Sequence, residues 1–270
     1  MLMLWRYPLK SAAGESLPAL LVGPDGPAGD RRWACLSSDG AVVSAKNPRR
    51  WGRLLAVRAS LQPSATGSTL IVEVPGVEPL VAGSVEADRA LSAWLGEPVR
   101  LVDTVPASAR LQRHWPSQDG MIPDWVTAQA GGTEHTEIAG ARPGGRFVDS
   151  SPIHLVTEAE LDDLSADLGI AIDVRRFRPN LVLRLEREPE VGDVLQVGGE
   201  VRLRVTLATP RCAIPGAAQP DLPAAPHVLR ALGRRRRPVG GYGRAACFGT
   251  YAEVLHAGTM SLGDSATLTS

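Results

Sequence analysis

The stretch VRLRVTL, residues 201–207, decides the fold, because its apolar and polar residues alternate with a period of two. Such alternation places the valines and leucines on one face and the arginines and the threonine on the other, as in a strand with one buried face. The segment Thr209-Pro210-Arg211-Cys212 follows almost directly. The sequence therefore predicts a regular strand that ends close to a cysteine.

Other short apolar runs lie between glycine, proline and aspartate residues, which is typical of strands bounded by turns. These runs are residues 19–22, 54–57, 69–72, 101–102 and 181–183. Their number indicates a protein made mostly of strands.

Two segments are expected to be helical, and a glycine follows each of them. Residues 84–95 begin at Ser84, a residue type that caps helix N-termini well. Residues 157–168 begin with a capping box, in which Thr157 is followed three residues later by Glu160. We therefore expect a mainly β (α+β) fold with a few helices.

The middle of the chain differs from the rest. Residues 105–147 hold few apolar runs and many glycine, proline, serine and threonine residues. A stretch of about 40 residues without regular structure is uncommon inside a domain and is often functional or linking. We place a domain boundary near residue 105, which gives domains of residues 1–105 and 106–270, with residues 106–147 as an irregular segment.

Composition and charge narrow the class of protein. The chain has 270 residues, with Lys+Arg and Asp+Glu both at 29, so its formal net charge is zero and nucleic-acid binding is not expected. Its start is apolar only as far as Arg6, too short for a secretory signal, and no run is long enough to cross a membrane. A cytoplasmic protein that acts on a small molecule, away from membranes, is expected.

The three cysteines, Cys35, Cys212 and Cys247, are too few and too scattered for a disulfide framework or an iron–sulfur cluster. The histidines show no metal-ligand spacing, and the usual nucleotide, zinc-protease and serine-hydrolase motifs are absent from the sequence. Packing is the expected role of Cys35 and Cys247, which lie in apolar surroundings.

Six segments combine charged, aromatic and turn-forming residues along the chain. Taken singly, each has an ordinary explanation: an exposed turn for Lys10 and Ser11, a local ion pair for Asp30 and Arg31, or a small buried side chain for Cys212. The segments are Tyr7-Pro8-Leu9-Lys10-Ser11, Asp30-Arg31-Arg32-Trp33, Ser150-Ser151-Pro152, Phe177-Arg178-Pro179-Asn180, Arg211-Cys212 and Phe248-Gly249-Thr250-Tyr251.

Taken together and in this order, the segments resemble the pattern of MOSC-domain proteins, named for the C-terminal domain of molybdenum-cofactor sulfurases. The likeness is greatest to the branch that contains the mitochondrial amidoxime-reducing component and its bacterial relatives, and it covers nearly the whole chain. The resemblance implies an N-terminal β-barrel-like domain packed on a MOSC β-barrel domain, with a cofactor between them.

The resemblance implies a molybdenum–molybdopterin cofactor whose metal is bound by the thiolate of Cys212. A soft thiolate suits a sulfur-rich redox metal, and an adjacent cation favours the thiolate form. Pro210 departs from the family pattern, which tends to have a small polar residue there. By the same resemblance, the phosphate and pterin are bound by Lys10, Ser11, Arg31, Ser150, Ser151, Arg178 and Arg211, while Asn180 and Tyr251 join Cys212 as catalytic residues near the metal.

The activity implied by the resemblance is the reduction of N-hydroxylated compounds by oxygen-atom transfer. Electrons would come from a separate donor, a ferredoxin, a flavoprotein or a cytochrome b5-like protein. Two alternatives stay open: a sulfur-transfer protein that carries a persulfide on Cys212, and a molybdopterin carrier without catalysis. Residues suited to a phosphate favour a cofactor binder, because a persulfide carrier needs no phosphate site.

The run Arg234–Arg237 lies between glycine and proline residues. Its ordinary explanation is a solvated loop. The functional alternative is a docking patch for an acidic electron donor, or a positively charged rim that attracts an anionic substrate.

Overall fold

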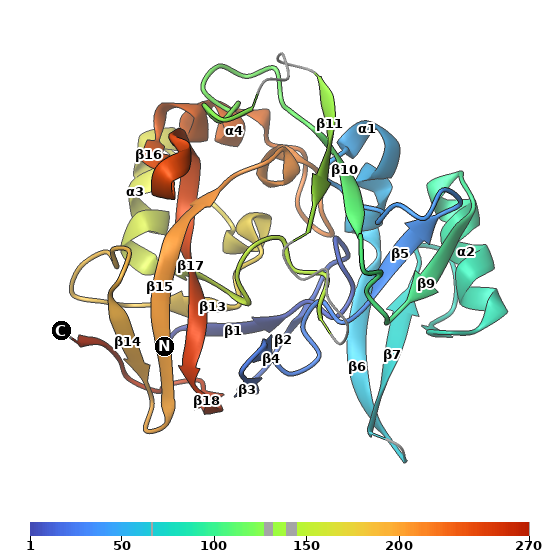
Figure 1. Cartoon of the computed structure of the whole chain (residues 1–270), viewed down its shortest axis with the longest axis horizontal. Coiled ribbons are helices and arrows are strands. Elements are labelled where there is room, and N and C mark those ends of the chain that lie inside the picture. The colour runs from blue at the N-terminus through green and yellow to red at the C-terminus, as the bar shows by residue number, and fades with distance from the viewer. Residues whose placement is uncertain (66, 127–131, 139–144, 270) are drawn as a thin grey trace.

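A computed structural model of the chain describes residues 1–65, 67–126, 132–138 and 145–269. Strands dominate these residues and helices are few, which confirms the expected mainly β fold (Figure 1). The α-helices are α1 Pro48–Trp51, α2 Val85–Leu95, α3 Glu158–Leu168 and α4 Pro226–Arg234, and the 3-10 helices are η1 Gly52–Ala56, η2 Val174–Phe177, η3 Ile214–Gly216 and η4 Gly240–Tyr242.

The largest sheet of the described residues has nine strands in the order β19-β14-β15-β17-β12-β13-β1-β2, with β16 paired to β17. It occupies the left-hand side of Figure 1, where α3 and α4 also lie. Its strands are β1 Met3–Arg6, β2 Glu15–Ser16, β12 Ile153–Thr157, β13 Leu181–Leu183, β14 Val194–Val197, β15 Val201–Pro210, β16 Arg236–Pro238, β17 Arg244–His256 and β19 Ala266–Thr269.

Smaller sheets make up the remainder. β5 pairs with β9, and β6, β7 and β8 form a three-stranded sheet; both lie with α2 on the right-hand side of Figure 1. The strands are β3 Ala19–Gly23, β4 Gly26–Pro27, β5 Ala34–Ser37, β6 Arg58–Ser64, β7 Gly67–Glu73, β8 Leu80–Val81, β9 Val99–Val102, β10 Arg110–His114, β11 Thr133–Glu137 and β18 Gly258–Ser261.

The two ends of the chain are joined through shared sheets. β1 pairs with β13, so that Met3 lies opposite Val182, and β3 pairs with β18, so that Leu20 lies opposite Met260. Leu4 belongs to the same apolar core as the buried residues of β15. The first strands therefore complete the C-terminal half as well as lead into the N-terminal sheets.

The predicted strand at residues 201–207 belongs to β15, and its alternation holds over Val201–Val205, where the apolar residues are fully buried. A register shift between Val205 and Leu207 then breaks the pattern, and Leu207 is only half-buried. A bulge of this kind bends a strand and redirects the residues beyond it. It precedes the segment that carries Cys212.

Both predicted helices are confirmed. Ser84 caps α2, and Thr157 caps α3 by accepting a hydrogen bond from the backbone N–H of Glu160 at 3.1 Å. The reciprocal half of the capping box is wrong, because the Glu160 side chain is buried and its Oε2 accepts from Gly249 N at 2.7 Å. Glu160 therefore joins α3 to β17 rather than closing the first helical turn.

Two other expectations are also corrected. Residues 54–57 are not a strand: η1 covers most of them, and the consecutive residues Leu54 and Leu55 are both buried, which a strand with alternating faces does not allow. The segment 105–147 is not wholly irregular, since β10 and β11 pair within it. Its residues 127–131 and 139–144 lie outside the described residues.

The domain boundary near residue 105 stays a prediction. The sheets do not divide the chain cleanly in two, because β1 and β3 from its start pair with β13 and β18 from its C-terminal half. The described part of the chain contains no helix that is both long and apolar enough to span a membrane.

Candidate functional site

A cavity lies where the two halves of the chain meet, and it encloses about 690 Å³ of empty space, counting the part open to solvent. Nine of the ten site residues predicted from the sequence line it, and the exception, Ser150, is exposed. The nine are Lys10, Ser11, Arg31, Ser151, Arg178, Asn180, Arg211, Cys212 and Tyr251. Segments distant in sequence thus converge on one site, although the role of each residue stays a prediction.

Cys212 is held rigidly at the end of β15. The backbone N–H of Arg211 donates to the carbonyl of Ala246 at 2.8 Å, which fixes this segment to β17. Cys212 is 8% exposed and packs in a small apolar cluster with Ala45 and Leu55. The sulfur therefore sits in the cavity wall on a well-supported backbone.

The described side-chain hydrogen bonds of Arg211 go to Phe177 and His154, and none goes to the adjacent Cys212. Its Nη2 donates to the carbonyl of Phe177 at 2.9 Å, and its guanidinium lies 5.5 Å from the centre of the Phe177 ring. It also approaches His154, whose pKa burial and this nearby cation hold well below the usual value. His154 is thus a neutral ring in the cavity wall, and Arg211 contributes to its positive field.

Two lysines share one carboxylate in this cavity. The Nζ atoms of Lys10 and Lys46 both lie 2.9 Å from Oδ1 of Asp149, and both lysines are buried. Burial lowers the pKa of Lys46 to about 8, and burial also lowers that of Lys10, although Asp149 partly offsets it. Two cations on one anion leave an excess of positive charge.

Arg178 is the least satisfied cation of the site. It is 8% exposed, its guanidinium stacks 4.4 Å from the centre of the Tyr7 ring, and no acceptor for its N–H groups occurs among the described residues. Burial lowers its pKa to about 10. A buried guanidinium without an acceptor indicates room for an anion.

Backbone strain coincides with this site. Ser11, Arg31 and Arg178 have φ values of 67°, 46° and 57°, in the left-handed region that costs most residues about 1–2 kcal/mol. Strain of this kind persists where the surrounding structure over-determines it, and it clusters at functional sites. Their concurrence in one cavity supports a binding role.

Asn180 and Tyr251 differ in their availability. The Asn180 side chain is fully buried; its Oδ1 accepts from His154 N at 3.1 Å and its Nδ2 donates to Trp5 O at 3.3 Å, so it ties β1 to the loop before β13. Burial raises the pKa of Tyr251 to about 12, which keeps its hydroxyl protonated in the cavity wall. Tyr251 is therefore a hydrogen-bond donor, whereas Asn180 is already engaged.

Four polar lining residues were not among the predicted site residues: Ser44, Lys46, Asp149 and His154. Lys46 follows a short apolar run and, in sequence, looks like any surface lysine. His154 is buried in the cavity wall. Only contacts between distant segments reveal these residues, although Asp149 directly precedes the Ser150-Ser151 motif.

The residues fit an anionic ligand that carries its own metal ligands. Among the described residues, five cationic side chains line the cavity, namely Lys10, Arg31, Lys46, Arg178 and Arg211, with Asp149 as the acidic one. No group of three or more His, Cys, Asp or Glu side chains suited to a metal ion occurs in the described ranges. A metal held through Cys212 would therefore need most of its ligands from a cofactor, and the cations suit a phosphate.

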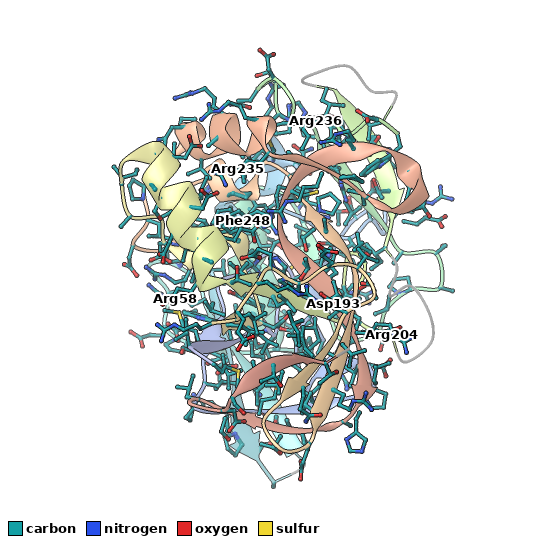
Figure 2. All side chains as sticks on the ribbon, turned by 90° about the vertical axis from the view of Figure 1, so that its left-hand side faces the viewer. Arg58, Asp193, Arg204, Arg235, Arg236 and Phe248 are labelled. Carbon is teal, nitrogen blue, oxygen red and sulfur yellow. The ribbon has the colours of Figure 1, made fainter. Side chains whose placement is uncertain are left out.

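The arginine run 234–237 is not a solvated loop, because it spans the end of α4 and the start of β16 (Figure 2). Arg236, for example, donates to the carbonyls of Gly120 and Ile122 at 2.6 and 2.7 Å. Each arginine also has an acidic partner, in order Asp167, Asp163, Asp124 and Glu160. The run therefore carries little unbalanced charge with which to attract an acidic protein.

Comparison with known proteins agrees with this geometry. Residues 1–96 match the MOSC N-terminal beta barrel domain and residues 143–267 match the MOSC domain. The chain is 26% identical over 243 residues to the mitochondrial amidoxime reducing component 2 of Rattus norvegicus, a match that covers 78% of this chain and 64% of that protein. It is 25% identical over 292 residues to the mitochondrial amidoxime-reducing component 1 of Homo sapiens, covering 97% of this chain and 80% of that protein.

Among solved structures, the crystal structure of YiiM from Geobacillus stearothermophilus aligns with a TM-score of 0.33 and 16% identity, over 59% of this chain and 75% of that chain. This likeness is too distant to carry an argument. The two domain matches, by contrast, contain all the motif segments of the cavity. The chain therefore belongs to the MOSC-domain proteins and carries the MOSC N-terminal beta barrel domain ahead of its MOSC domain.

Proposed function

We propose that this protein is a molybdenum-cofactor-dependent oxidoreductase that reduces N-hydroxylated compounds. The observation that carries the proposal is the meeting of Cys212 with five cationic side chains, among the described residues, in one cavity built by both halves of the chain. Relatives with 25–26% identity are named for amidoxime reduction. When bound, the cofactor would supply two-electron oxygen-atom chemistry, and the protein would bind and orient it.

The side chains divide this work by charge and position. Lys10 and Lys46, which now pair with Asp149, would donate hydrogen bonds to the cofactor phosphate instead. Arg178 would add a forked pair of N–H donors. The protonated Tyr251 hydroxyl would donate a hydrogen bond to an oxygen of the bound substrate or cofactor. Electrons would come from a separate protein, a ferredoxin, a flavoprotein or a cytochrome b5-like donor.

Metal content tests the proposal most directly. The protein is purified from a host that makes the cofactor, and molybdenum and pterin are quantified for wild type and Cys212→Ala. About one molybdenum per chain is expected in wild type, with most of it lost from the variant. Cys35→Ala and Cys247→Ala are matched controls, because both cysteines are buried but lie outside the cavity, and they should keep their molybdenum.

A second measurement separates the remaining alternatives. Reduction of benzamidoxime by the dithionite-reduced protein is expected of the enzyme but not of a molybdopterin carrier. Absence of both molybdenum and pterin, together with cyanide-labile sulfur that disappears in Cys212→Ala, would overturn the proposal in favour of sulfur transfer.

A further inference from the structure

A second cavity adjoins the first through Arg178, whose side chain belongs to the walls of both. It encloses about 660 Å³ of empty space, counting the part open to solvent, which is within the usual range of small-molecule pockets. Residues of the first 60 positions and of the MOSC domain line it together. The lining includes Trp5, Tyr7, Arg58, Arg175, Arg178 and Leu222.

The charges of this cavity leave one cation uncompensated. Arg58 pairs with Asp221 at 2.7 Å, and Arg175 pairs with Asp173 at 2.6 Å, so both of these arginines are balanced. Arg178, in contrast, has no acceptor among the described residues. Its guanidinium has five N–H donors, enough to serve a ligand on each side. The cavity therefore suits a ligand with a single negative charge.

Two further donors point to the same conclusion. The indole Nε1 of Trp5 and the hydroxyl of Tyr7 are buried and have no hydrogen-bond partner in the part of the chain that the structure describes. An indole N–H can only donate, and burial raises the pKa of Tyr7, so its hydroxyl keeps its proton. Unpaired buried donors are costly and uncommon, so their presence in two residues of one wall indicates a missing acceptor.

The shape of the wall indicates what carries that acceptor. The rings of Trp5 and Tyr7 stack with centroids 6.2 Å apart and an interplanar angle of 18°, and Leu222 adds an aliphatic surface. Aligned aromatic surfaces of this kind favour a flat apolar group. A flat group with one oxyanion satisfies the rings, the two donors and the single free cation together.

We propose that this cavity is a second ligand site, for a small aromatic monocarboxylate that binds Arg178 through its carboxylate and packs its ring against Trp5 and Tyr7. The site lies beyond the one that holds Cys212 and shares only Arg178 with its described lining, so benzoate binding is tested in protein that carries no cofactor. Cys212, Lys10 and Lys46 line the first cavity and are not part of the described lining of the second.

Isothermal titration calorimetry of the cofactor-free 270-residue chain with benzoate tests the proposal. Trp5→Phe and Tyr7→Phe each keep an aromatic ring and remove one donor. Trp94→Phe is the matched control, because its Nε1 donates to Arg53 O at 2.8 Å and the residue lines neither cavity. Lys46→Gln is the control for binding in the first cavity.

Wild type, Trp94→Phe and Lys46→Gln are expected to bind benzoate equally at millimolar concentrations, and uncharged benzamide should bind far more weakly. Trp5→Phe and Tyr7→Phe should each lose about fivefold in affinity, as expected for one hydrogen bond. The melting temperature of Tyr7→Phe should not fall, because its hydroxyl has no described partner, whereas Trp94→Phe loses a hydrogen bond and should melt lower. No benzoate binding by wild type, binding that survives both donor variants, or binding abolished by Lys46→Gln would overturn the proposal.

Discussion

The ammonium group of Lys46 lies 2.9 Å from Oδ1 of Asp149, the same oxygen that accepts a hydrogen bond from Lys10. One carboxylate thus holds two buried lysines that come from separate segments of the N-terminal half. Burial of the lysines without this counter-ion would be costly. Asp149 therefore stabilises a cationic cavity that has no other acidic lining residue among those described.

Replacement of Asp149 by asparagine should lower the free energy of unfolding of the cofactor-free protein by about 3 kcal/mol, because two buried ammonium groups lose their shared partner. Urea unfolding at neutral pH measures the loss. Asp163→Asn is the control, since this carboxylate is exposed and its loss should cost under about 1 kcal/mol. Equal losses in the two variants would show that Asp149 does not act as the counter-ion.

The contribution of Asp149 should also depend on pH. Burial alone would raise the pKa of its carboxyl, but Lys10 and Lys46 more than offset this and hold it well below the usual value. A folded-state pKa below that of the unfolded chain adds stability above the unfolded pKa of about 3.9, and this stability is lost as the pH falls through the folded pKa. The stability difference between wild type and Asp149→Asn should therefore be constant down to about pH 5 and shrink below about pH 4. A difference that stays constant in strong acid would contradict this.

Lys46 should affect cofactor retention if the proposed function holds. Lys46→Gln should lower the molybdenum and pterin content several-fold, because it removes a cation from the phosphate site, and Lys46→Arg should restore most of it. Arg49→Gln is a matched control from the same segment, since Arg49 is exposed and does not line the cavity. Loss of cofactor in Arg49→Gln as large as in Lys46→Gln would indicate a general charge effect instead.

The arginine run offers a test of structural against docking roles. Arg236→Ala should cost about 2–3 kcal/mol, because its half-buried guanidinium bonds two carbonyls and Asp124. Arg234→Ala should cost under about 1 kcal/mol, because its single ion pair is exposed. Thermal or urea unfolding distinguishes the two. If Arg234→Ala leaves stability unchanged but slows reduction by a protein electron donor, the run docks that donor after all.

What the sequence predicts well here is local. The caps and glycines that bound α2 and α3 act within a few residues, and the alternation of β15 reflects one buried face. The order of the motif segments also predicted nine of the cavity residues. The caps, glycines and alternation each lie within a single segment, whereas the motif order extends from Tyr7 to Tyr251.

What the sequence misses depends on contacts between distant segments. Glu160 looks like the second half of a capping box, yet Arg237 and the backbone N–H of Gly249 draw its carboxylate into the core. Burial raises the pKa of Glu160, and Arg237 only partly offsets this. Lys46 and Asp149 are 103 positions apart by their residue numbers, and neither carries a local pattern that announces the pair. Spacing rules describe neighbours along the chain, so such pairs stay hidden.

Gly249, in the motif that ends at Tyr251, shows how this core fixes a residue type. Its φ is 74°, and an added Cβ would lie 2.5 Å from the carbonyl of Leu155 and 2.7 Å from Nε2 of His154. Gly263 has a similar φ of 89° but no atom within 4 Å of its Cβ position. Gly263→Ala should therefore cost only the conformational strain, about 1–2 kcal/mol.

Gly249→Ala should cost about 2 kcal/mol more than Gly263→Ala, because the methyl group must also displace a buried strand and the His154 ring. Urea unfolding of the two variants isolates this steric part, since the strain is common to both. His154 lines the cavity, so the displacement should also lower the molybdenum content of Gly249→Ala and leave that of Gly263→Ala unchanged. Equal costs would mean that conformation alone, rather than the close approach of β12, requires glycine beside this site.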